Sequence, residues 1–143
     1  FGGSHMSALL FYLEDIVIKY QPDQIFIYEG DNDIASGKKP SKILKDTRKV
    51  IHKLNNALPS VPVVLISPKP SLARWDLKQE YEELNQRFER YAIKNDQIDF
   101  INVWPLMLNK EGEPMKELFI EDGLHMSKPG YNLWAGEIIK YIL

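Results

Sequence analysis

The chain has 143 residues, of which 44% are hydrophobic and 27% charged, and its 18 basic and 20 acidic side chains give a formal net charge of −2. Nucleic-acid and anionic-membrane binders usually carry a strong basic excess, so this balance argues against both, and no apolar run approaches the roughly 18 residues of a membrane span. The sequence contains no cysteine, which excludes disulfides and cysteine-based zinc or redox sites.

Helices and strands are expected to alternate in the first half of the chain. Apolar residues at helical spacing predict a helix over residues 7–20. The short β-branched and aromatic run at 24–30 predicts a buried strand, followed by a loop. Ser41 is expected to cap a second helix, which Pro59 ends.

The same alternation continues in the second half. Residues 61–67 predict a second strand, with Pro62 among its first residues, where no ladder donor is required. Asp76 is expected to cap a third helix, and residues 98–103 predict a third strand. A last helix is expected over residues 129–142, since proline suits a first helical position.

This order of elements predicts an α/β fold. Strands alternating with helices imply right-handed crossovers and a parallel sheet with helices on both faces. Ligands bind beyond the carboxyl ends of such strands, which indicates the segments after Gly30, Ser67 and Val103. Three strands are few for this fold, and no strand precedes the first helix. We therefore expect one domain over residues 1–143 that lacks one or more N-terminal strands.

The first candidate site is the polar run at residues 29–33, Glu-Gly-Asp-Asn-Asp, directly after the first strand. Turn-forming residues such as these also occur in loops without any chemical role. Asp31 and Asp33 could present carboxylates to Mg²⁺, as in a receiver-like or phosphatase-like domain. Alternatively, Asn32 could donate its amide N–H to a developing oxyanion.

The second candidate site lies just before the last helix, where Asp122 and His125 are separated by a glycine and a leucine. This spacing allows the carboxylate to reach the imidazole Nδ1. Such a contact fixes the imidazole tautomer and leaves Nε2 free as a base. The alternative is a surface turn with an incidental histidine.

Other common chemistries find no support in the sequence. The glycine-rich dinucleotide and P-loop motifs are absent, as is the G-x-S-x-G nucleophile elbow. The three histidines do not recur at metal-ligand spacing, which argues against a zinc site.

Taken together, the two candidate segments resemble the SGNH hydrolases, also called GDSL-type esterases and lipases. The run at 30–33 is similar to the G-x-N-D block of that family, and the run at 122–125 to its D-x-x-H block. The resemblance implies a three-layer α/β/α, flavodoxin-like fold. It also implies that Asp122 and His125 are catalytic and that Asn32 belongs to an oxyanion hole.

The first seven residues resemble the glycine-containing second block of the same family. By that resemblance, Gly3 supplies a second oxyanion donor through its backbone N–H. Gly3-Ser4-His5-Met6 also matches a linker that commonly remains after a purification tag is cleaved, but it continues into the predicted helix without a seam. The family's G-D-S block, which carries the nucleophilic serine, is absent. We therefore expect that serine upstream of residue 1 and no activity from these 143 residues alone.

The resemblance implies a serine esterase that acts on short acyl esters of lipid or carbohydrate, and it requires no metal or organic cofactor. The expected partner is a small-molecule ester, with no nucleic acid. Lys69, Arg74, Trp75 and Trp104 are candidates for lining the substrate cleft. An alternative function is a non-catalytic carbohydrate- or ligand-binding module that has lost its nucleophile.

Overall fold

Three short parallel strands form the centre of the computed structural model, which describes residues 2–143. Strands β1 (Ile25–Tyr28), β2 (Val63–Ile66) and β3 (Ile98–Ile101) lie in the order β1-β2-β3, with β2 in the middle. Phe1, the first residue of the glycine-containing segment, lies outside the described residues. The parallel sheet predicted from the alternating elements is therefore confirmed.

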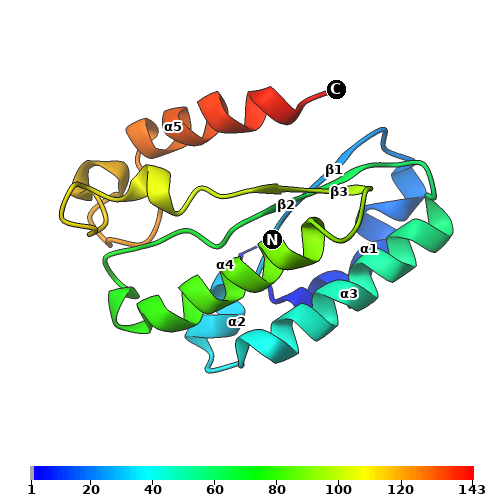
Figure 1. Cartoon of the computed structure of the whole chain (residues 1–143), viewed down its shortest axis with the longest axis horizontal. Coiled ribbons are helices and arrows are strands. Elements are labelled where there is room, and N and C mark those ends of the chain that lie inside the picture. The colour runs from blue at the N-terminus through cyan, green and yellow to red at the C-terminus, as the bar shows by residue number, and fades with distance from the viewer. Residues whose placement is uncertain (1) are drawn as a thin grey trace.

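Helices cover both faces of this sheet, as Figure 1 shows. Helices α1 (Met6–Ile16), α3 (Pro40–Ala57) and α4 (Lys78–Ala92) lie on one face and contact one another in sequence order. Helix α5 (Lys128–Ile138) lies on the other face. The expected three-layer arrangement is present. None of the helices formed by the described residues is both long enough and apolar enough to span a bilayer.

The side chains of β2 explain why both layers form. Val63 and Leu65 belong to the apolar cluster under α1, α3 and α4, whereas Val64 and Ile66 belong to the cluster under α5. Successive side chains of a strand point to opposite faces, and all four residues of β2 are buried. A central parallel strand covered on both faces reads as a continuous apolar run, as this one does.

Several details differ from the sequence predictions. The first and last helices end earlier than predicted, at Ile16 and Ile138, and a 3-10 turn follows each. The predicted loop after β1 begins with a short helix, α2 (Asp31–Ala35). Helix α3 begins before Ser41, because Pro40 already occupies its first turn and Lys39 is the N-cap residue. Asp76 does not cap α4; it lies in a 3-10 turn that leads directly into that helix.

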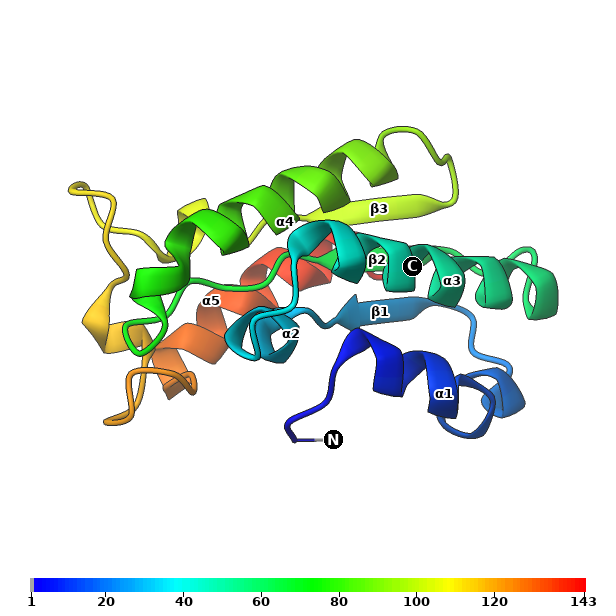
Figure 2. The same cartoon turned by 90° about the horizontal axis from the view of Figure 1, so that it is seen from below.

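Strand β1 lies at one edge of the described sheet, beside α1 (Figure 2). An apolar groove of about 180 Å³ runs along this edge. Its walls come from α1, with Leu9 and Leu13, and from β1, with Ile25 and Ile27. The unpaired side of β1 therefore faces a hollow that apolar side chains line.

Candidate active site

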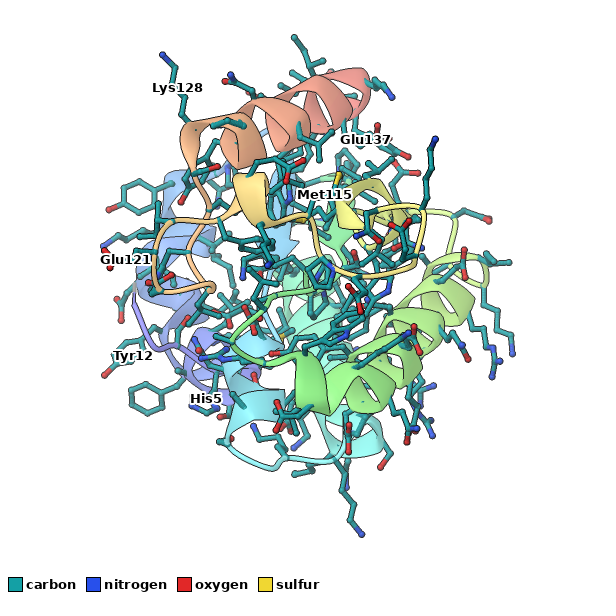
Figure 3. The ribbon with its side chains drawn as sticks, turned by 90° about the vertical axis from the view of Figure 1, so that its left-hand side faces the viewer. His5, Tyr12, Met115, Glu121, Lys128 and Glu137 are labelled. Atoms are coloured by element: carbon teal, nitrogen blue, oxygen red, sulfur yellow. The ribbon has the colours of Figure 1, made fainter. Side chains whose placement is uncertain are left out.

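A cavity of about 620 Å³ lies at the carboxyl end of β1. Gly3, Asn32, Lys69, Arg74 and His125 are among the residues that line it. Figure 3 views this end of the molecule, with His5 labelled on the segment before α1 and Glu121 on the segment before α5. Four chain segments that are far apart in the sequence therefore meet around one cavity: those before α1, after β1, after β2 and before α5.

Asp122 and His125 form a hydrogen-bonded pair at the rim of this cavity. The Asp122 Oδ2 atom lies 2.6 Å from the His125 Nδ1 atom. Its Oδ1 atom accepts hydrogen bonds from the backbone N–H groups of Leu124 and His125, at 2.8 and 2.9 Å. These contacts, led by the one with the imidazole, lower the pKa of Asp122 to about 2. The carboxylate therefore stays ionised at neutral pH, and its contact with the imidazole is made through Nδ1 and not through Nε2.

The turn that carries this pair is fixed by the backbone. Gly123 has a φ of +64°, which favours glycine, and an added Cβ would lie 3.1 Å from the Cβ of Leu72. The Gly123 carbonyl accepts a hydrogen bond from Ala73 N–H at 3.1 Å, and Ile120 N–H donates to the His125 carbonyl at 2.9 Å. The loop before α5 is thereby tied to the loop after β2.

Asn32 lies in the first turn of α2, two residues after Gly30. Its Nδ2 atom donates to the backbone carbonyl of Ser4 at 3.1 Å, and its Oδ1 atom accepts from the Arg74 guanidinium at 3.2 Å. The amide is therefore held between the N-terminal segment and the loop after β2.

The N-terminal segment is bound closely to the turn after β1. Met6 N–H donates to the Asp33 carboxylate at 2.9 Å, and the Ser4 hydroxyl donates to the Glu29 carboxylate. Burial raises the pKa of Glu29, although the Ser4 hydrogen bond opposes this shift. Gly3, with a φ of +72°, lines the same cavity as Asn32. Gly3 and Asn32, the two oxyanion donors that the resemblance implies, therefore line the same cavity.

Asp31 and Asp33 do not share partners. The Asp31 carboxylate binds Arg74 at 2.6 Å and Lys69 at 3.3 Å, whereas the fully buried Asp33 binds Lys38 and the N-terminus of α1. Residues 2–143 contain no group of three side chains placed to hold a metal ion. Side-chain cations of the chain itself thus occupy the places where a receiver-like site would need Mg²⁺.

The four candidate cleft residues separate into two pairs. Lys69 and Arg74 line the cavity, but Trp75 and Trp104 do not. The two tryptophan rings stack on each other with centroids 5.8 Å apart, and Trp104 is buried in the core. The cavity wall also contains residues that the sequence did not single out: Tyr28, Leu124, Met126, Tyr131 and Trp134. Of these, Tyr28 carried a usable signal, because it is the last residue of β1 at the carboxyl end of the sheet.

A parallel α/β sheet with an Asp–His pair and a held amide at its carboxyl end is the arrangement of SGNH-type hydrolases. The chain belongs to the GDSL-like Lipase/Acylhydrolase family, whose model matches residues 2–133. The matched range includes Gly3 to Met6.

Solved structures share this fold. A GDSL-like lipase from Bacteroides thetaiotaomicron superposes with a TM-score of 0.84 at 23% identity, covering 97% of this chain and 71% of its own. A lipase/acylhydrolase from Enterococcus faecalis superposes with a TM-score of 0.82 at 22% identity, and the match covers 98% of this chain and 71% of that protein. A carbohydrate esterase family 3 protein from Talaromyces cellulolyticus gives 0.78 at 16% identity, covering 99% and 70%. No curated protein sequence matches the chain.

Proposed function

We propose that the full-length protein is a carboxylic-ester hydrolase that works by acyl transfer. The observation that carries this proposal is that His125, paired with Asp122, lines the same cavity as the held amide of Asn32. A base and an oxyanion donor lining one cavity are the two groups that acyl transfer from an ester to a serine requires besides the serine itself.

In the proposed reaction, a serine hydroxyl attacks the ester carbonyl while His125 Nε2 takes its proton. Asp122 holds the imidazole and stabilises its charged form. The negative charge on the carbonyl oxygen is stabilised by Asn32 Nδ2 and by Gly3 N–H. Collapse of the intermediate transfers the proton to the leaving alkoxide, and water then releases the acyl group by the same steps. This sequence needs no metal or organic cofactor.

We place the nucleophilic serine in a segment that precedes these 143 residues. The apolar groove along β1 supports this placement, because a further parallel strand on that edge would keep apolar side chains covered. Ser4, Tyr28 and Glu29 line both the groove and the cavity. A strand in the groove would therefore end beside the cavity.

We propose short acyl esters of carbohydrates or lipids as the substrate class. The names of the structural neighbours, a carbohydrate esterase and two lipases among them, cover both kinds of ester. At identities of 16–23% these neighbours show the fold alone, so the choice between carbohydrate and lipid esters rests on assays of substrate preference.

The decisive experiment measures hydrolysis of an aryl acetate by the full-length protein and by its His125→Ala and Asp122→Asn variants. We expect His125→Ala to lower turnover on the order of 10⁴- to 10⁶-fold, and Asp122→Asn on the order of 10⁴-fold. The control is His52→Ala, since His52 lies on the exposed side of α3. Retention of more than a tenth of wild-type activity by His125→Ala would contradict the triad. A folded full-length protein that binds acylated sugars without hydrolysing them would favour the binding-module alternative.

A further inference from the structure

We propose that Arg74 and Asp31 are positioning residues for the oxyanion hole: together they fix the direction in which the Asn32 amide points. This inference rests on the proposed ester hydrolysis. It assigns a role to two charged side chains of the cavity wall that the reaction scheme above does not use.

The two ends of the Asn32 amide have different partners. A guanidinium has only donors, so Arg74 can bind the carbonyl end of the amide and not its NH₂ end. The Ser4 carbonyl has only lone pairs, so it can bind only the NH₂ end. The two neighbours, at 3.2 and 3.1 Å, therefore select one of the two amide orientations. In this orientation the second N–H of Nδ2 is left for a substrate oxygen.

Arg74 is itself held in place by the Asp31 carboxylate. Its NH1 group donates to Asp31 Oδ1 at 2.6 Å while NH2 donates to Asn32, so the flat fork spans two neighbouring acceptors. A lysine ammonium is a single point of charge and does not reproduce this bridge.

Asp31, which binds the arginine, is in turn fixed by other side chains. The Tyr81 hydroxyl also donates to Oδ1, and Tyr28 hydroxyl and Lys69 Nζ lie 3.1 and 3.3 Å from Oδ2. Burial raises the pKa of Asp31, but Lys69, Tyr81 and Arg74 more than offset it, and the pKa lies below its ordinary value. Asp31 is therefore ionised, and four side chains bind its carboxylate.

A direct substrate contact is the competing role for Arg74, because its side chain lines the cavity. The two roles differ in their dependence on Asn32. A residue that acts only by orienting the amide loses its effect once the amide is removed, whereas a residue that binds substrate keeps it.

The experiment is a double-mutant cycle in the full-length protein, with aryl acetate hydrolysis as the readout. We expect Arg74→Met to lower kcat about 10-fold with KM changed less than about twofold, since a misdirected donor weakens transition-state contacts. We expect the Asn32→Ala/Arg74→Met double variant to have a kcat within about twofold of Asn32→Ala alone. The matched control is Arg87→Met, whose guanidinium forms an exposed ion pair with Glu83.

Two results would overturn the proposal: unchanged kcat in Arg74→Met, or losses that multiply in the double variant. Should Arg74→Met not fold, as judged by thermal melting, Arg74→Lys keeps the charge beside Asp31 and should show the same kcat loss. Full activity in Asn32→Ala would instead count against the oxyanion role in the proposed function. If Asn32→Ala lowers kcat as expected but Arg74→Met keeps the wild-type kcat, only the positioning role of Arg74 is contradicted.

Discussion

The carboxylate of Asp33 accepts a hydrogen bond from the backbone N–H of Met6 at 2.9 Å, across 27 positions of sequence. The same carboxylate, which has no solvent exposure, also binds the Lys38 ammonium. The Asp33 side chain thus joins the start of α1 to the α2 segment. The Asn32–Ser4 hydrogen bond ties the same two segments, and together the two contacts hold the part of the chain in which Gly3 and Asn32, the oxyanion donors that we propose, line one cavity.

Replacement of Asp33 by alanine should therefore destabilise the fold. The change leaves the Met6 N–H without its acceptor and removes the nearer of the two carboxylates beside Lys38, since Asp46 lies 3.7 Å from that ammonium. We expect a loss of about 3 kcal/mol in the free energy of unfolding. Urea unfolding of the full-length protein measures it. The control is Glu83→Ala, which breaks an exposed ion pair and should cost less than about 1 kcal/mol. Equal losses in the two variants would contradict the structural role of Asp33.

Replacement of Asn32 by alanine tests the amide as an oxyanion donor. Because the donor acts mainly on the transition state, kcat should fall roughly 10²- to 10³-fold while KM changes little. Steady-state kinetics on an aryl acetate give both constants. Asn56→Ala is a suitable control, since Asn56 contacts His52 on the exposed side of α3. A rise in KM at constant kcat would instead indicate that Asn32 binds the ground state.

Glu29 should make the protein less stable as the pH rises. Burial raises its folded-state pKa above the unfolded-state value of about 4.3. Between the two values the folded chain holds a proton that the unfolded chain has released, so the free energy of unfolding falls with increasing pH. Glu29→Gln removes this dependence while keeping an acceptor for Ser4. In urea unfolding at pH 4 and pH 7, the free energy of unfolding of the variant relative to that of wild type should be higher at pH 7 than at pH 4. A constant difference between the two proteins would refute the shift.

Local sequence carried enough information for the sheet and for the Asp122–His125 turn. The strands are short runs rich in apolar residues: all four residues of β2, the first and third of β1, and the first and last of β3 are buried. Asp122 and His125 are three residues apart, so their contact depends mainly on one turn with a glycine. Such features require no knowledge of distant partners.

The anchor around Asp31 could not be read from the sequence in the same way. Arg74 and Asp31 are 43 positions apart, and Tyr81 and Asp31 are 50 apart. Tyr81 fits the apolar stripe of α4, and nothing in that pattern indicates that its hydroxyl reaches a carboxylate. The short helix α2 was missed for a related reason, since glycine, aspartate and asparagine favour turns and only tertiary contacts hold them in a helix here.

Gly30, the residue immediately before α2, should not tolerate a side chain. Its φ is +114°, and an added Cβ would lie 2.9 Å from Leu84 Cδ2 and 3.2 Å from Pro68 Cγ. Leu84 is fully buried, so its side chain can move away only by displacing other core side chains. Backbone strain and overpacking therefore add, and we expect Gly30→Ala to cost about 3 kcal/mol in the free energy of unfolding.

Gly136 provides the matched comparison, since it lies in α5 with no atom within 4 Å of an added Cβ. Alanine there should stabilise by about 0.5 kcal/mol, because it restricts the unfolded chain and suits a helix. Urea unfolding of both variants separates a demand for glycine from mere tolerance of it. If Gly30→Ala were as stable as wild type, the turn that directs Asn32 into the cavity would not depend on the left-handed backbone at Gly30.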